Sequence, residues 1–377
     1  VVSAREEASK IGIEIMKKGG NAFDAMVATE LALAVAYPYA GNIGGGGFMV
    51  FRKANGEVGS LDYREKAPLA ATKDMFLDKD KNVIKGKSTE TPLAIGVPGT
   101  IAGVFAVHKK YGSLPMAEIM KPVIALAERG VVVTQKQEKR LNDYRDLIIK
   151  ANGLKTKFAT IYKQNDTIKY PELAETLKRI SKNGRDEFYK GKTAKILVKY
   201  LQKNGAIITL EDLAKYEAKW RTPLRFDYKD LNIISMSPPS SGGICLAEIM
   251  KMIAPYELST MGHNSSNAIQ VIVEAERRAY ADRSFYLGDP DFVKIPLKAL
   301  MADDYLKQRM SNFSFDKATL SSDIKEGKVS YNESTETTHY SIIDPFGNAI
   351  AATTTINDGY GSKYYCDELG RSEEHTS

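Results

Sequence analysis

The sequence is poor in the residues that usually hold metals or form disulfide frameworks. Its 377 residues include two cysteines, Cys245 and Cys366, and four histidines. Two cysteines so far apart give neither the spacing of a zinc site nor a set of paired disulfides. Asp282, Asp289 and Asp291 lie near one another in the sequence, but they lack the regular spacing of a calcium loop and suit turn capping better. We therefore expect no metal site.

Two further absences exclude classes of partner. The apolar stretch of residues 25–36 falls short of the about 20 residues that span a membrane, and Thr29 and Glu30 interrupt it. The net charge is +6, from 53 basic and 47 acidic residues. Basic clusters interleaved with aromatic residues, which are typical of nucleic-acid binding, are missing from the sequence. We expect neither a membrane span nor a nucleic-acid partner.

Two common catalytic patterns are also missing. The glycine run at residues 44–47 has neither the Lys-Ser/Thr pair of a phosphate loop nor the spacing of a dinucleotide-binding fingerprint. We expect these glycines to allow close packing of the backbone instead. Ser240 and Ser241 do not lie in a Gly-x-Ser-x-Gly motif, so a serine hydrolase is not expected.

The amino-terminal third of the chain predicts two helices and a hairpin. Residues 3–6, Ser-Ala-Arg-Glu, form a capping-box pattern that predicts a helix ending at Gly19-Gly20. Asn21 is placed to cap a second, largely apolar helix over residues 22–36. Strands are predicted at residues 48–52 and 58–63, joined by an Asn-Gly turn that is typical of hairpins.

The rest of the chain mixes helices and strands. The pattern is helical from about residue 100 to 208, strand-like over residues 224–234, and helical again over residues 244–253 and 267–286. A polar linker follows at residues 316–336. Helices flanking strands that are paired through short turns indicate a mixed α/β, or α+β layered, fold.

A second hairpin is predicted near the carboxyl end. Asp344-Pro345-Phe346-Gly347 has the residue preferences of a type I turn. If residues 345–347 form the loop, Asp344 pairs with Asn348, and counting outwards places Thr337 opposite Thr355. Their Cβ atoms would then be about 4.5–5.5 Å apart. A bulge at the glycine would shift this register by one residue.

The pattern alone favours packing over catalysis at these threonines, because threonine is a common residue of β-strands. His339 shares a strand face with Thr337. A single histidine at such a position is more often a hydrogen-bonded structural group than a general base.

Several motifs change this balance when they are taken together. They occur in one characteristic order, and together they resemble the γ-glutamyltranspeptidases, also called glutathione hydrolases, over nearly the whole chain up to Ser362. The resemblance implies an N-terminal-nucleophile hydrolase fold, an αββα sandwich. The motifs are the first fifty residues with their GNIGGGGFMV end, then LDYREKAP, AIGVPGTIAGVFAVHKKYGSLP, SPPSSGG, EAERRAYADRSFYLGDPDF and TETTHYSIIDPFGNAIAATTTIN.

The resemblance implies a chemistry for Thr337. An internal threonine hydroxyl is a poor nucleophile, but cleavage of the Glu336–Thr337 bond would free an α-amine with an ordinary pKa of about 7.7–8.0. That amine can accept the hydroxyl proton, so Thr337 becomes both nucleophile and carrier of its base. Such enzymes cut themselves, which implies a large subunit of residues 1–336 and a small subunit that starts at Thr337. No metal or organic cofactor is needed.

Three more residues match functional positions of the family. Thr355 matches a second threonine that holds the nucleophile, and the register derived from the turn agrees. Asn357 matches a residue that contacts the γ-glutamyl group. Arg64 matches the arginine that binds the substrate α-carboxylate, for which a planar guanidinium is well shaped. Without the resemblance, an ion pair between Arg64 and a neighbouring carboxylate would be the better interpretation.

The sequence also departs from the family pattern. The family's small subunit supplies an acid for the substrate amine, a serine pair and a Gly-Gly oxyanion hole, and none of these follows Asn357. We therefore expect a fold that is incomplete at its carboxyl end and a 377-residue polypeptide that is itself inactive. Residues 337–362 would begin the small subunit. Residues 363–370 are treated as doubtful, and residues 371–377 resemble translated sequencing-adapter read-through.

The resemblance implies glutathione and other γ-glutamyl compounds as substrates, with water or an amino-acid or dipeptide amine as acceptor. It further implies a location in the periplasm or outside the cell. Two alternatives stay open: a related acylase or poly-γ-glutamate-processing enzyme, and a non-catalytic binding protein with the same fold.

Overall fold

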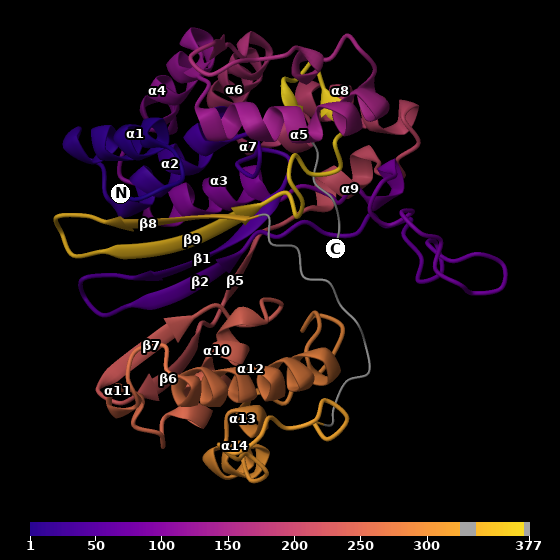
Figure 1. Ribbon diagram of the computed structural model, residues 1–377. Helices are drawn as coiled ribbons and strands as arrows, with labels where there is room; N and C mark the ends of the chain where they lie inside the picture. The colour runs from indigo at the N-terminus through magenta and orange to yellow at the C-terminus, as the bar shows by residue number, and fades with distance from the viewer. Residues whose placement is uncertain (325–336, 373–377) are drawn as a thin grey trace. The chain divides into compact units, whose positions relative to one another are not determined.

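The computed structural model describes residues 1–324 and 337–372, which group into two compact units (Figure 1). The first unit combines Val1–Trp220 with Ser334–Ser377, and the second comprises Arg221–Glu333. These units differ from the two subunits expected from cleavage before Thr337, because the strand that begins there lies in the sheet of the first unit. The division into subunits stays a prediction.

The first unit is built on a five-stranded sheet with the order β5-β2-β1-β9-β8. β1 is antiparallel to both β2 and β9, and β9 is antiparallel to β8. Figure 1 shows the carboxyl-terminal hairpin β8–β9, in yellow, beside the indigo strands β1 and β2. Segments that are far apart in the sequence therefore share one sheet. Its strands are β1 (Gly46–Arg52), β2 (Val58–Asp62), β5 (Lys219–Arg221), β8 (Thr337–Ile343) and β9 (Ala349–Thr355).

The predicted hairpin near residue 55 is confirmed. Arg52 pairs with Val58, and Gly56 in the loop has a φ of 85°, a left-handed conformation that glycine adopts without strain. The first strand begins at Gly46, two residues before the predicted start, because the glycines there also pair with β9.

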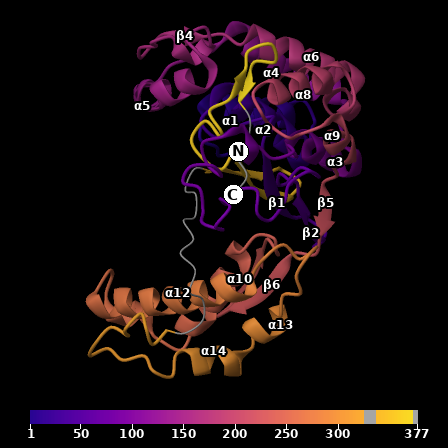
Figure 2. The same cartoon turned by 90° about the vertical axis from the view of Figure 1, so that its right-hand side faces the viewer.

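The second predicted helix is also confirmed, as α2 (Ala22–Ala36), and every one of its residues is buried. The Asn21 side chain accepts hydrogen bonds from the backbone N–H groups of Phe23 and Asp24, while Asp24 accepts from the Asn21 N–H at 2.9 Å. This is a capping box. α2 contacts both β8 and β9, and Figure 2 shows α1, α2 and α3 on the same side of the sheet.

The predicted start of the first helix is wrong. α1 (Glu6–Lys17) begins two residues later than a cap at Ser3 requires, and Arg5 occupies the cap position without a side-chain cap. The Ser3 hydroxyl bonds to the Arg5 carbonyl and to the Ser9 hydroxyl. Arg5 extends instead to Gln137, at 2.9 Å, so a contact with a distant helix displaces the local pattern.

Further helices surround α2 and complete the first unit. Among the described residues, no helix is both long and apolar enough to cross a membrane. The other α-helices of this unit and two of its short strands are α3 (Thr100–Tyr111), α4 (Met116–Arg129), β3 (Val131–Val132), α5 (Gln135–Asn152), β4 (Thr167–Ile168), α6 (Pro171–Asn183), α7 (Arg185–Tyr189), α8 (Lys192–Lys203) and α9 (Leu210–Lys215).

The β8–β9 hairpin has the predicted turn and register. Asp344 and Asn348 flank the loop, and Gly347 donates its N–H to the Asp344 carbonyl at 3.1 Å. Counted from this turn, Thr337 pairs with Thr355 without a shift. The Asp344 carboxylate accepts from the N–H groups of Phe346 and Asn348. It also accepts from the N–H of Ala22 at 2.9 Å, which attaches the turn to the start of α2.

The second unit packs a hairpin against helices. The strand-like pattern that we described over residues 224–234 corresponds to two strands, β6 (Leu224–Tyr228) and β7 (Leu231–Ser235), which form a hairpin. The chain reverses at Lys229, whose φ is 52°. The predicted helices appear as α10 (Gly242–Ile253) and α12 (Ser266–Tyr286), and α11 (Leu258–Met261), α13 (Leu297–Leu300) and α14 (Asp303–Arg309) complete the unit. Of the expected polar linker, residues 325–336 lie outside the described residues.

The end of the described chain returns to the first unit. Tyr365, Cys366 and Leu369 are buried in its core. β10 (Tyr365–Cys366) pairs with β11 (Arg371–Ser372). Residues 363–370, which we treated as doubtful, thus contribute buried side chains, and residues 373–377 lie outside the described part.

The buried carboxylate at the hairpin turn generates the first prediction. Asp344→Ala should lower the free energy of unfolding by at least about 2 kcal/mol, because three backbone N–H groups lose a charged acceptor. Urea-induced unfolding of the chain measures this loss. Asp143→Ala, which removes only an exposed ion pair with Lys139, is the control and should cost less than about 1 kcal/mol. Equal losses in the two variants would contradict the role given to Asp344.

Candidate active site

The β9 strand brings the sequence-predicted site residues together. Thr355 lies at its end, paired with Gly46 of β1 on one side and with Thr337 of β8 on the other. Asn357 follows two residues later, and Arg64 lies just after β2. The Thr337 side chain and Glu336 lie outside the described part of the structure, so their predicted roles stay predictions.

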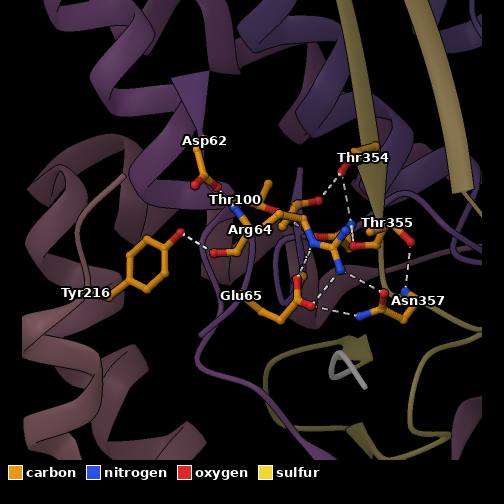
Figure 3. Close-up of polar contacts among 11 residues, drawn as sticks. Asp62, Arg64, Glu65, Thr100, Tyr216, Thr354, Thr355 and Asn357 are labelled. Atoms are coloured by element: carbon orange, nitrogen blue, oxygen red, sulfur yellow. Dashed lines mark hydrogen bonds and ion pairs between the residues drawn. The ribbon is translucent and has the colours of Figure 1, made fainter. Parts of the chain in front are cut away.

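Arg64, Glu65 and Asn357 form a hydrogen-bonded group (Figure 3). The Arg64 guanidinium binds both oxygens of the Glu65 carboxylate, from Nε at 2.8 Å and from Nη2 at 2.9 Å. Nη2 also donates to the Asn357 Oδ1 at 3.0 Å, while the Asn357 Nδ2 donates to Glu65 at 3.0 Å. The structure thus brings Arg64 and Asn357 together, and the ion pair with a neighbouring carboxylate, considered from sequence alone, is present as well.

The backbone and the guanidinium of Arg64 make further contacts. Tyr216 donates its hydroxyl to the Arg64 carbonyl at 2.6 Å, and Asp62 accepts the Arg64 backbone N–H at 3.1 Å. The guanidinium carbon lies 5.5 Å from the centre of the Phe48 ring, within the range of a cation–π contact. The Arg64 side chain is 27% exposed and the Glu65 side chain 6%. The cation is therefore held in a fixed orientation but remains accessible to a solute.

The backbone at Asn357 turns sharply after β9. Its φ is 64°, in the left-handed region where asparagine is tolerated better than most residues. The Asn357 N–H donates to the Thr355 Oγ at 2.8 Å. This bond orients the Thr355 hydroxyl and directs the Asn357 amide towards Arg64.

Asn42 is a central residue that the sequence analysis missed. Its buried amide Nδ2 donates to the Thr354 hydroxyl at 3.1 Å and to the Thr355 carbonyl at 2.9 Å. Its Oδ1 accepts from the Gly45 N–H and from the Thr100 hydroxyl, both at 2.7 Å. One side chain therefore joins the glycine run, the end of β9 and the start of α3. Its position just before the glycine run was the one sequence feature that could have pointed to this role.

The glycine run allows the close backbone packing that we predicted. A Cβ atom on Gly46 would lie 2.6 Å from the backbone nitrogen of Glu65, and one on Gly45 or Gly47 would meet carbonyl oxygens of β9. Any larger residue would separate β1 from β9 and from the segment that carries Arg64.

His339 behaves as the structural group considered from sequence. Its Nδ1 lies 2.9 Å from the Thr353 hydroxyl and its Nε2 3.3 Å from the Ser341 hydroxyl. Burial lowers the pKa of His339 below its ordinary value. A neutral imidazole bonded to two hydroxyls bridges β8 and β9 on the face that also carries Thr355.

The arrangement can bind an anionic group and present hydroxyls beside it. Arg64 and Asn357 supply donors, and the Thr355 hydroxyl lies next to the backbone of Thr337. Among residues 1–324 and 337–372, no group of three or more His, Cys, Asp or Glu side chains is placed to hold a metal. Cys245 and Cys366 are both buried.

Comparison with known proteins identifies the family. The gamma-glutamyltranspeptidase family model matches residues 8–371. The chain belongs to the gamma-glutamyltranspeptidase family. It is 43% identical over 374 residues to the glutathione hydrolase proenzyme of Escherichia coli K12. That match covers 98% of this chain but 64% of the relative, so the chain spans slightly less than two thirds of the relative's length.

Solved structures confirm the predicted fold class. The gamma-glutamyltranspeptidase of Helicobacter pylori superposes with a TM-score of 0.84 at 45% identity, covering 89% of this chain and 97% of that one. A cephalosporin acylase from Bacillus halodurans superposes with a TM-score of 0.84 at 22% identity, covering 99% of this chain and 68% of that one, a likeness of fold alone. The fold is that of the N-terminal-nucleophile hydrolases.

The left-handed backbone at Asn357 generates a prediction. Asn357→Gly and Asn357→Ala both remove the amide between Arg64 and Glu65, but only alanine carries the cost of a positive φ. The alanine variant should therefore unfold at lower urea, with about 1 kcal/mol less stability than the glycine variant. At Asn204, whose φ is −92°, alanine should be no worse than glycine. The same order at both positions would contradict the backbone argument.

Proposed function

We propose that this chain is part of a γ-glutamyltranspeptidase, or glutathione hydrolase, that activates itself by cleavage at Glu336–Thr337. The observation that supports this most directly is the strand register. Thr337 is paired with Thr355, the last residue of β9. Two residues further on, the Asn357 side chain accepts a hydrogen bond from Arg64. Family membership gives this arrangement its chemical meaning.

The proposed activation is an acyl shift followed by hydrolysis. The Thr337 hydroxyl attacks the Glu336 carbonyl carbon, and the peptide C–N bond breaks as the amine leaves, which yields an ester. Water then attacks the ester and releases the Glu336 carboxylate and the Thr337 hydroxyl. Thr337 now carries a free α-amine, which can take the hydroxyl proton in the next attack.

The proposed turnover uses the same hydroxyl. Thr337 attacks the amide carbon of a γ-glutamyl compound such as glutathione, and the amine of the remaining peptide leaves. The γ-glutamyl ester is released to water or to the amine of an amino acid or peptide. Thr355 would hold the nucleophile, in keeping with its hydroxyl being fixed by the Asn357 N–H.

Substrate choice in this proposal depends on Arg64. A γ-glutamyl group carries an α-carboxylate three carbons from the scissile carbonyl, and a guanidinium fork can meet both carboxylate oxygens. Asn357 would contact the same group. The large and small subunits stay associated after cleavage in this proposal. Export to the periplasm or out of the cell belongs to it too, and is supported by family membership alone.

Self-cleavage provides the direct test. The test uses the whole-length natural protein that contains this chain. There, Thr337→Ala should give one uncut chain, because the attacking hydroxyl is gone. The unaltered protein should give two chains, the smaller beginning at Thr337 by mass spectrometry. Ser341→Ala, four residues along the same strand face, is the control and should still be cut. A cut Thr337→Ala variant would refute the nucleophile, and an uncut active protein would favour another mechanism.

A pair of substrates tests Arg64. Arg64→Ala should lower kcat/KM for a γ-glutamyl anilide about 10²-fold, since losing one partner of a desolvated charge pair costs about 2–5 kcal/mol. A 4-aminobutyryl anilide lacks the carboxylate and should be turned over equally by both proteins. Lys66→Ala removes a nearby cation and should leave both rates unchanged.

The same assay separates the acylase alternative. A glutaryl anilide keeps the carboxylate and lacks the α-amine, so a γ-glutamyl-specific enzyme should hydrolyse it poorly. Turnover of the glutaryl compound at the rate of the γ-glutamyl compound would instead favour an acylase.

A further inference from the structure

Glu30 is a carboxylic acid in the centre of a largely apolar helix. It lies in the middle of α2, where it is fully buried. Its Oε2 accepts a hydrogen bond from the Tyr340 hydroxyl of β8 at 2.6 Å, while its Oε1 makes no hydrogen bond with the described part of the chain. Burying a carboxyl group without a cation is costly. A packing role alone would be met by leucine or methionine at lower cost.

The groups around Glu30 are three hydroxyls, two from strands β8 and β9 and one from the residue that follows β2. Tyr340 comes from β8 and Thr354 from β9. Tyr63 follows β2 and continues its pairing, through two backbone hydrogen bonds with Gly47. All three are fully buried. The Tyr63 ring is fixed between Gly47 and Gly103, where added Cβ atoms would lie 2.8 and 2.5 Å from ring carbons.

Each of these residues lies within three positions of a proposed site residue. Tyr63 precedes Arg64, Thr354 precedes Thr355, and Tyr340 lies three residues after Thr337. Side chains alternate between the faces of a strand. The cluster of Glu30, Tyr63, Tyr340 and Thr354 therefore lies on the helix-covered face of the sheet, opposite the face that carries the Thr355 side chain.

We propose that Glu30 is a positioning residue: it holds β8 and β9 against α2 and so sets the distances between the Thr337 backbone, Thr355 and Arg64. The proposal rests on the proposed function for its chemical readout. Errors of about 1 Å in the position of reacting groups cost as much as about 10²-fold in rate, so a support for two strands has measurable consequences.

The protonation state of Glu30 gives the proposal a distinctive readout. Burial raises the pKa of Glu30 to about 7, and the hydroxyls of Thr354 and Tyr340 oppose part of that rise. Burial holds the pKa values of Tyr63 and Tyr340 well above 10, so these two facing phenols stay protonated. Glu30 is thus mainly neutral below pH 7 and mainly ionised above it. Glutamine imitates the neutral form at every pH.

The experiment compares four variants of the whole-length natural protein between pH 6 and 9. Glu30→Leu and Tyr340→Phe break the Glu30–Tyr340 bond, and Glu30→Gln keeps an acceptor that cannot ionise. Thr29→Val is the matched control, because its buried hydroxyl has no hydrogen bond within the described residues. The readouts are the rate of cleavage before Thr337, kcat and KM for a γ-glutamyl anilide, and hydrogen exchange of the amides of β8 and β9.

We expect Glu30→Leu and Tyr340→Phe to slow cleavage and lower kcat about 10-fold or more, with faster amide exchange in β8 and β9. Glu30→Gln should match the unaltered protein below pH 7 and depart from it above, while Thr29→Val should match it throughout.

The proposal is overturned if Glu30→Gln and Tyr340→Phe, both close in shape to the native residues, keep the native rates, pH profile and exchange. These two variants decide the matter if Glu30→Leu does not fold. If the unaltered protein shows no cleavage before Thr337, the proposed function fails, and amide exchange alone still decides the role of Glu30.

Discussion

The register of the β8–β9 hairpin is the constraint on which the rest of the site depends. A slip of one residue would move every side chain of β8 to the other face of the sheet. Thr337 would then lose Thr355 as its partner, and Tyr340 would lose Glu30. Asp344 holds the register, because its carboxylate accepts the N–H of Phe346 within the turn, the N–H of Asn348 after it, and a third N–H from the start of α2. An anion is also favoured there by the helix dipole.

Two hydrogen bonds join α2 to β8 and to the turn that follows it, and their spacing explains why the helix fits against the hairpin. Ala22 meets Asp344, and Glu30 meets Tyr340. Eight residues of helix rise about 12 Å, and four residues of strand cover about 13–14 Å. These lengths match, so both contacts form without bending either element. The helix cap at Asn21, which sets where α2 begins, thereby also determines which helix residue reaches the strand near the proposed nucleophile.

The features that could be predicted from sequence are those determined by neighbouring residues. The type I turn at Asp344, the cap at Asn21 and the Asn-Gly hairpin each depend on a few consecutive residues, and all three are correct. Predictions failed where a distant contact determines the local structure. The first helix does not begin with a cap at Ser3, because Arg5 occupies the cap position and bonds to Gln137. Asn42 and Glu30 were missed for the same reason, since their partners lie about three hundred positions away. Arg64 and Asn357 were found through resemblance to a family, because no local pattern distinguishes them.

The pairing of Arg64 with Glu65 bears on how the site would recognise a substrate. The two charges cancel, so long-range attraction for an incoming carboxylate is weak. The contribution to recognition that remains is the fixed orientation of Arg64. Glu65 and Asn357 hold its guanidinium in one plane through hydrogen bonds of 2.8 to 3.0 Å. A fixed fork loses less side-chain entropy on binding than a mobile one. The same group that fixes Arg64 includes Asn357, whose backbone orients the Thr355 hydroxyl. The proposed substrate-binding group and the backbone around Thr337 are therefore linked through one short segment, residues 355–357, so a small disturbance of β9 would affect both.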